Sequence, residues 1–125
     1  MQVLDASAVL ALLWSEPGAD VVLSHLADAH MSAVNMTEVL SRMIDRGFSL
    51  EVSLSLVEGI GCPVHDHALD LAIATAALRP VTRRLGLSLG DRACLALAQS
   101  LGAGVVTADR AWAGSDLGVA ITVIR

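Results

Sequence analysis

The sequence predicts a single α/β domain in which a mostly parallel central sheet is covered by helices on both faces, a three-layer α/β/α arrangement. A chain of 125 residues that is 54% hydrophobic is long enough for one packed core and too short for two ordinary domains. Short, valine-rich apolar segments alternate along it with longer stretches of helical spacing. The short segments are continuously apolar, which is typical of strands buried on both faces of a parallel sheet.

The expected elements follow from this alternation in chain order. Extended segments are predicted at 2–4, 30–34, 62–65, 104–107 and 119–124. Helices are predicted at 6–14, 17–28, 36–46, 50–58, 66–78 and 91–101. Between 79 and 90, Pro80 and two glycines break the helical pattern, so we expect a short helix and a turn there. No linker, repeat or low-complexity tract is recognisable, and residues 1–125 are expected to form one domain.

The charged residues exclude several kinds of chemistry. The formal net charge is −5, and all eight basic residues are arginines. Without lysine, the chain cannot form a Schiff base, use a P-loop lysine, or supply the lysine partner of a phosphoacceptor aspartate. The acidic balance argues against a general nucleic-acid binder with a basic face, but not against an enzyme that reaches phosphate through a metal ion. The scarcity of aromatic residues (Trp14, Phe48 and Trp112) argues against recognition by base stacking.

The apolar residues and cysteines indicate the compartment. The longest unbroken apolar run, residues 8–14, has seven residues, far short of the roughly 20 that a membrane-spanning helix needs. The amino terminus has no basic region and meets Asp5 almost at once, which argues against a cleavable signal and predicts a cytoplasmic location. Cys62 and Cys94 lack a C-x-x-C spacing, so both are predicted to be core residues rather than a disulfide or a zinc site.

Four acidic residues are expected at one edge of the sheet, where the carboxyl ends of parallel strands gather. Asp5 directly follows the first strand, and Asp109 closes the fourth. Glu38 is expected in the first turn of the helix after the second strand, and Asp91 is expected to open the helix 91–101. Each acid alone has a structural explanation, because acids favour helix amino termini, and residues 35–38 and 88–91 both read as capping boxes.

Capping does not explain why four such acids converge, since their mutual repulsion would destabilise the fold unless a cation lay among them. A hard divalent cation such as Mg²⁺ fits a set of carboxylate oxygens. The chemistry then available is phosphoryl transfer to water, which predicts a nuclease or a phosphatase. Ser7 and Thr107, each two residues from an acid, are expected to donate hydrogen bonds to a carboxylate or to bound water.

The sequence resembles a PIN domain and, more narrowly, the VapC-type toxins of bacterial and archaeal toxin–antitoxin pairs. The likeness spans essentially the whole chain and rests on four segments in order, residues 3–12, 35–40, 86–98 and 107–112. It implies a PIN-like three-layer fold and an endoribonuclease that depends on Mg²⁺ or Mn²⁺. By the same likeness, Asp5 and Asp91 would be the most direct metal ligands, while Glu38 and Asp109 would complete the site or orient the attacking water.

The resemblance also implies partners and supporting residues. It suggests a homodimer, an RNA substrate, and a small antitoxin protein that occupies or blocks the acidic site. Ser7, Asn35 and Thr107 would support the carboxylates. Arg92 and Arg110 directly follow two of the acids and are the arginines expected to contact RNA.

Two alternatives remain open. A small metal-dependent phosphatase or a receiver-type phosphoacceptor domain could also cluster aspartates in an α/β fold. The missing lysine and the run Asp5-Ala6-Ser7, in place of an Asp-x-Asp motif, argue against both. The other alternative is a noncatalytic binding module that keeps the fold without turnover.

Overall fold

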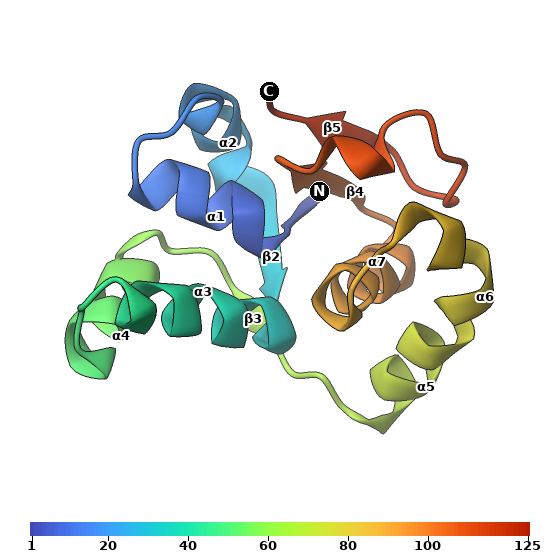
Figure 1. The fold of residues 1–125 in the computed structure, drawn as a ribbon, viewed down its shortest axis with the longest axis horizontal. Coiled ribbons are helices and arrows are strands. Elements are labelled where there is room, and N and C mark those ends of the chain that lie inside the picture. Colours follow the sequence, from blue (N-terminus) through green and yellow to red (C-terminus); the bar gives the residue numbers. More distant parts are fainter.

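The computed structural model describes residues 1–125 and contains one five-stranded, all-parallel sheet (Figure 1). Its strands are β1 (Gln2–Leu4), β2 (Ala29–Ser32), β3 (Val64–His65), β4 (Gly104–Thr107) and β5 (Ile121–Val123). They lie in the order β3-β2-β1-β4-β5. The order reverses between β1 and β4, and in open parallel sheets ligands bind at such a reversal, outside the carboxyl ends of the strands. The predicted parallel α/β fold is confirmed.

Helices follow the strands along most of the chain. They are α1 (Ala6–Leu13), α2 (Ala19–His25), α3 (Ala33–Asp45), α4 (Leu50–Gly59), α5 (Leu69–Ala77), α6 (Arg79–Thr82) and α7 (Leu89–Leu101), with short 3₁₀ turns η1 (Leu26–Asp28), η2 (Arg83–Leu85) and η3 (Arg110–Trp112). The short helix and turn expected at 79–90 are present as α6, η2 and the left-handed Gly86. None of these helices combines the length and the apolar composition of a membrane span.

The hydrophobic core lies in two layers, one on each face of the sheet. Val3 and Leu4 are both fully buried, and because neighbouring strand residues face opposite sides they belong to different clusters. Leu4 packs with side chains of α1, α2 and α3, whereas Val3 packs with side chains of α7 and with Trp112. Figure 1 shows α1 to α4 and α5 to α7 on opposite sides of the sheet, the predicted three-layer arrangement.

The start of α3 differs from the prediction. The expected strand 30–34 ends at Ser32, whose side-chain oxygen accepts a hydrogen bond from the Val34 amide and caps α3. Asn35 therefore lies inside the helix, so residues 35–38 are not the capping box that the sequence predicted. A serine at the end of a buried strand is a good N-cap, and this signal outweighs the β-branched Val34, which favours continuation of the strand.

Other boundaries are also shorter or shifted. The expected helix 17–28 begins only at Ala19, because Gly18 adopts a left-handed conformation with φ of 93°, and it gives way to η1 after His25. The helix expected at 66–78 begins at Leu69. The last helix starts two residues before Asp91, with Ser88 as its N-cap. Of the two cysteines, Cys94 is fully buried as predicted, whereas Cys62 is only partly buried.

Candidate active site

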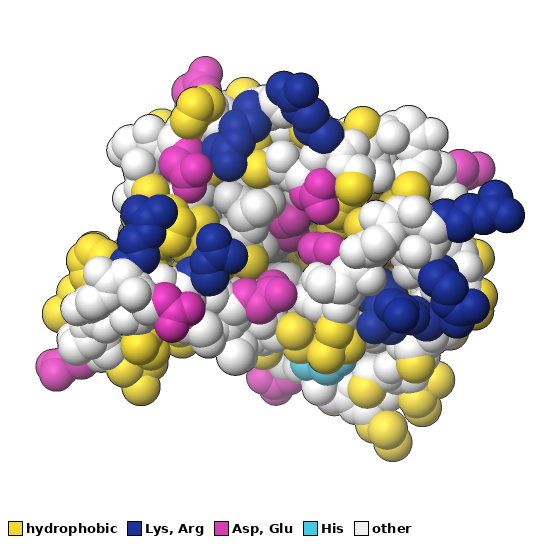
Figure 2. Space-filling model, viewed as in Figure 1, with side chains coloured by type: hydrophobic (Ala, Val, Ile, Leu, Met, Phe, Trp, Pro, Cys, Tyr) yellow, Lys and Arg dark blue, Asp and Glu magenta, His cyan; other side chains and the backbone are white.

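A cavity of about 560 Å³ opens at the carboxyl edge of the sheet, where β1 and β4 end beside α3 and α7. All four acids singled out in the sequence line it: Asp5, Glu38, Asp91 and Asp109. Figure 2 shows acidic side chains gathered near the centre of this face, with basic side chains beside them. The expected convergence of the acids is therefore present in the folded chain.

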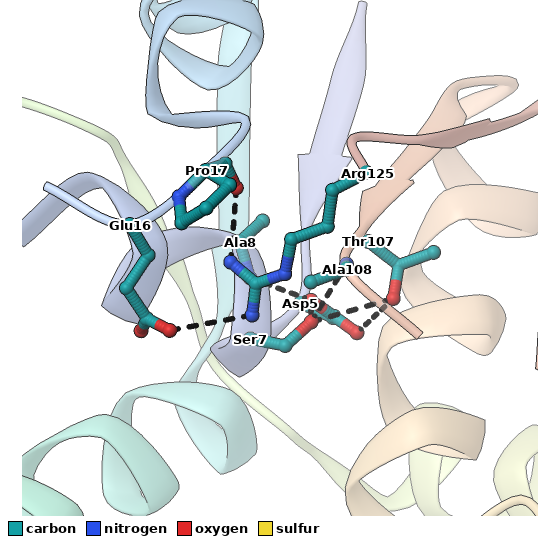
Figure 3. A network of polar contacts seen from close by, with 8 residues as sticks. All are labelled: Asp5, Ser7, Ala8, Glu16, Pro17, Thr107, Ala108 and Arg125. Atoms are coloured by element: carbon teal, nitrogen blue, oxygen red, sulfur yellow. Dashed lines mark hydrogen bonds and ion pairs between the residues drawn. The ribbon is translucent and has the colours of Figure 1, made fainter. Parts of the chain in front are cut away.

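Asp5 is held at the reversal of the sheet by hydrogen bonds to both carboxylate oxygens (Figure 3). Its Oδ1 accepts from the Ser7 hydroxyl at 2.6 Å and from the Ala8 amide at 2.9 Å, which makes Asp5 the N-cap of α1. Its Oδ2 accepts from the Thr107 hydroxyl at 2.6 Å. Both hydroxyls thus donate to a carboxylate, as expected, and Thr107 links the end of β4 to the end of β1.

Burial dominates the electrostatics of Asp5, whose side chain is only 3% exposed. Removal from water, aided by the nearby charge of Asp91, raises the pKa of Asp5 from 3.8 to about 6. The hydrogen bonds from Ser7, Thr107 and Ala8 act in the opposite direction but do not offset the burial. The carboxylate form of Asp5 is therefore costly in the isolated protein, as expected for a group that a cation would stabilise.

Glu38 is positioned by the contact between α3 and α7. Its Oε2 accepts a hydrogen bond from Asn35 Nδ2 at 2.9 Å, and the same amide donates to the carbonyl of Gly90 at 3.1 Å. Gly90 leaves room for this arrangement, because a Cβ added there would overlap the Glu38 carboxylate. Partial burial and the charge of Asp91 raise the pKa of Glu38.

Asp91 and Asp109 each combine a capping role with a free oxygen. Asp91 and Ser88 form a reciprocal capping box at the start of α7, in which Asp91 Oδ2 accepts from the Ser88 amide at 2.8 Å. Asp109 caps η3 by accepting from the Ala111 amide at 2.9 Å through Oδ1. In both residues the second oxygen accepts no hydrogen bond from the chain. Capping therefore explains the positions of Asp91 and Asp109, and it leaves one carboxylate oxygen of each available to a ligand.

The donor set fits a hard divalent cation that retains most of its water. No three carboxylate, imidazole or thiolate side chains lie close enough together to ligate one ion directly. The acids on the cavity wall offer only oxygen, which Mg²⁺ prefers, and Mg²⁺ commonly takes one or two carboxylates directly while reaching others through water. A closed tetrahedral site of sulfur and nitrogen donors, as zinc prefers, does not fit this wall.

The arginines on the cavity wall are not those that sequence reasoning selected. Arg42, Arg46 and Arg125 line the cavity. Arg92 is outside it and donates to the Thr75 carbonyl, and Arg110 is also outside and donates to the Arg125 carbonyl oxygen. A signal for the first two was present in the sequence, since Glu38, Arg42 and Arg46 recur at four-residue spacing and so share one face of a helix.

Histidine and cysteine take no place on the cavity wall. His30 and His65, on the neighbouring strands β2 and β3, contact each other through ring nitrogens 2.9 Å apart. Cys94 is fully buried, and burial together with the charges of Asp5 and Asp91 raises the pKa of its thiol well above the usual value. A thiolate nucleophile is therefore not available here near neutral pH.

The fold and this site define the chain as a parallel α/β protein with an acidic cleft at the strand reversal. The family model of the PIN domain matches residues 3–114. This chain therefore belongs to the PIN domain family, as its sequence indicated. No curated protein sequence is similar enough to be matched.

Several solved structures share the fold over nearly their whole length. A toxin–antitoxin complex from Klebsiella pneumoniae contains a chain with 19% identity and a TM-score of 0.74, in a match that covers 100% of this chain and 98% of that one. DNA-bound VapBC from Salmonella typhimurium matches with 21% identity and a TM-score of 0.74, covering 99% and 98%. FitAcB from Neisseria gonorrhoeae matches with 19% identity and a TM-score of 0.62, covering 98% and 96%. At these identities, the likeness establishes a common fold.

Proposed function

We propose that this chain is a metal-dependent endoribonuclease, the VapC-type toxin of a type II toxin–antitoxin pair, acting in the cytoplasm. The observation that carries the proposal is the joint presence of Asp5, Glu38, Asp91 and Asp109 on one cavity wall of a PIN domain. The proposed reaction is hydrolysis of an RNA phosphodiester bond. Water adds to phosphorus, one phosphorus–oxygen bond breaks, and the leaving ribose oxygen takes up a proton.

We assign the metal to the acidic wall, with Asp5 and Asp91 as the most direct ligands and Mg²⁺ or Mn²⁺ as the ion. When bound, such an ion lowers the pKa of water and offsets the charge that develops on the attacking and leaving oxygens. Ser7 and Thr107 keep the Asp5 carboxylate in one orientation through hydrogen bonds of 2.6 Å. Burial favours the protonated, neutral form of Asp5. In this proposal, Ser7 and Thr107 counteract that effect and position the Asp5 carboxylate as a metal ligand.

Proton transfer at this wall would fall to carboxylates, because no imidazole lines the cavity. Glu38 suits the role of base, since its raised pKa brings it closer to neutrality and Asn35 fixes one of its oxygens. Asp109 keeps one oxygen free to hold water by hydrogen bonding. Arg92 and Arg110 remain proposed RNA contacts at the margin of the site.

The partner proposals rest on the family and on the shared fold. The similar structures are described as toxin–antitoxin or VapBC complexes, which supports a cognate antitoxin protein for this chain. We propose that the antitoxin covers the acidic cavity and blocks access to RNA. A homodimer is proposed on the family resemblance alone.

The proposal is tested by incubating the purified protein with total RNA in Mg²⁺, in Mn²⁺ and in chelator, and mapping new 5′ ends. The matched control is Asp5→Asn, which keeps the size of the side chain and removes the carboxylate. We expect discrete, metal-dependent cuts from the unmodified protein only. Cleavage that persists in chelator or in the Asp5→Asn protein would contradict the proposal.

The second candidate is a noncatalytic PIN-fold module that binds RNA or a partner without turnover. It is favoured by the absence of three ligands close enough to hold an ion directly. RNA binding by the unmodified protein with no cut under any metal condition would support this alternative. A phosphatase has no comparable observation in its favour.

A further inference from the structure

The cavity has a basic wall beside its acidic one. Glu38 and Arg42 on helix α3 and Arg46, its C-cap residue, recur at four-residue intervals, and all three line the cavity. Each interval advances about 6 Å along a helix and keeps the side chains on one face. The helix therefore presents two guanidinium groups in a row that leads away from the carboxylates.

The guanidinium groups of Arg42 and Arg46 have no hydrogen-bond or ion-pair partner within the chain. Neither Arg42 nor Arg46 forms an ion pair or donates a side-chain hydrogen bond. The third arginine of the wall is engaged, because Arg125 donates to the Pro17 carbonyl at 2.9 Å and pairs with Glu16 at 3.3 Å (Figure 3). Ten N–H donors on Arg42 and Arg46 together, about five on each guanidinium, thus remain available to a ligand in the cavity.

Arg46 is also held in a defined orientation. Its guanidinium carbon lies 3.8 Å from the centre of the Trp14 ring, a cation–π contact. The contact with the ring uses none of the N–H donors of Arg46, which form no hydrogen bond within the chain. A planar, pre-oriented fork of this kind matches two oxygens of a phosphate better than a flexible ammonium group does.

We propose that Arg42 and Arg46 form a phosphate-binding track for a single RNA strand, in which they hold backbone phosphates next to the one at the acidic wall. The inference rests on the proposed function and adds to it the path of the substrate. A chain with net charge −5 repels a polyanion over much of its surface, so local cations are needed where the strand enters. The track runs along α3 from Glu38 toward Trp14.

The experiment measures binding of a short, fluorescently labelled single-stranded RNA of mixed sequence by anisotropy, in Mg²⁺ and at several salt concentrations. All variants are made in the Asp5→Asn background, so that cleavage does not consume the probe. Arg42→Gln and Arg46→Gln are each expected to weaken binding about tenfold. Each is also expected to reduce the slope of log K against log salt by about 0.7, the loss of one single-strand phosphate contact.

Two further variants separate the track from general charge effects. Arg84→Gln removes an exposed arginine outside the cavity and should leave affinity and slope unchanged. Arg46→Lys keeps the charge but loses the planar stack on Trp14, so the slope should be kept while affinity falls. Melting temperatures of all variants should stay close to that of the parent, since Arg42 and Arg46 are exposed.

The outcomes distinguish failure of the track from failure of the function. Tight RNA binding that Arg42→Gln and Arg46→Gln leave unchanged, or that Arg84→Gln weakens equally, would overturn the track while leaving the nuclease proposal standing. If the Asp5→Asn parent does not bind RNA in Mg²⁺ and the unmodified protein makes no cut in Mg²⁺ or Mn²⁺, the proposed function fails and the track fails with it.

Discussion

Replacing Thr107 by valine removes the hydroxyl that contacts Asp5 and leaves the volume of the side chain almost unchanged. That hydroxyl is fully buried, donates to Asp5 Oδ2 at 2.6 Å, and accepts from the Asp109 amide at 3.0 Å. A hydrogen bond to a charged group contributes about 1.5–3 kcal/mol, and a neutral one about 1 kcal/mol. We therefore expect Thr107→Val to lower the free energy of unfolding by about 2.5–4 kcal/mol at pH 8 in chelator.

The effect should depend on pH in a definite direction. Thr107 stabilises the ionised form of Asp5, whose pKa is about 6 in the fold. At pH 5 most of the Asp5 carboxyl is neutral, so the lost hydrogen bond is an ordinary one and the expected loss falls to about 1–2 kcal/mol. The destabilisation by Thr107→Val should therefore be larger at pH 8 than at pH 5.

Thr82→Val is the matched control for this experiment. The Thr82 hydroxyl is also fully buried, but it donates to the neutral Leu78 carbonyl at 2.7 Å. Its replacement should cost about 1 kcal/mol at either pH. Urea denaturation of both variants and the parent measures the difference. Equal losses at Thr107 and Thr82, or a loss at Thr107 that does not grow with pH, would refute the account of the Asp5 network.

Three other predictions concern the same wall. Gly90→Ala should displace the Glu38 carboxylate and reduce metal-dependent cleavage at least tenfold, while far-ultraviolet circular dichroism shows an intact fold; unchanged activity would contradict the tight contact. Mg²⁺ at ten times its dissociation constant should stabilise the protein by about 1.4 kcal/mol, which raises the Tm by a few degrees, and it should have little effect on the Asp5→Asn variant. An unchanged Tm of the unmodified protein in Mg²⁺ would argue against the metal site. In chelator, the Asp5 carboxyl loses its proton near pH 3.8 when unfolded but near pH 6 when folded, so stability should fall by up to about 3 kcal/mol as pH rises across that window. Urea midpoints should show this fall in the unmodified protein and a smaller one in Asp5→Asn, whereas stability that rises through the window would oppose the burial of Asp5 as described.

The sequence predicted the layout of the sheet because the physical signals were local. Short strands such as residues 104–107 show no alternation of apolar and polar side chains. This pattern is typical of strands that helices cover on both faces, as in a parallel sheet. Once strands are parallel, Asp5 and Asp109 must share an edge, whatever the strand order. The approximate place of the acids therefore followed from composition and spacing alone.

Boundaries and side-chain partners depended on contacts that spacing does not encode. The N-cap Ser32 starts α3 earlier than the β-branched Val34 suggested, because a side-chain cap outweighs a modest propensity. Arg92 follows an acid in sequence but reaches Thr75 on α5, since neighbouring residues on a helix face different directions. Arg42 and Arg46 reach the cavity because Val39 and Met43 on the same helix are buried against the core, which fixes the rotation of α3.

In the proposed reaction, the acidic cavity directs water onto an RNA phosphodiester bond. The most direct measurement is cleavage of a defined RNA in Mg²⁺ and in water enriched in the heavy oxygen isotope, followed by mass spectrometry of both product ends. We expect one heavy oxygen in a terminal phosphate monoester, with no product from Asp5→Asn. A 2′,3′-cyclic phosphate end, which forms when the neighbouring ribose hydroxyl attacks in place of water, would contradict it.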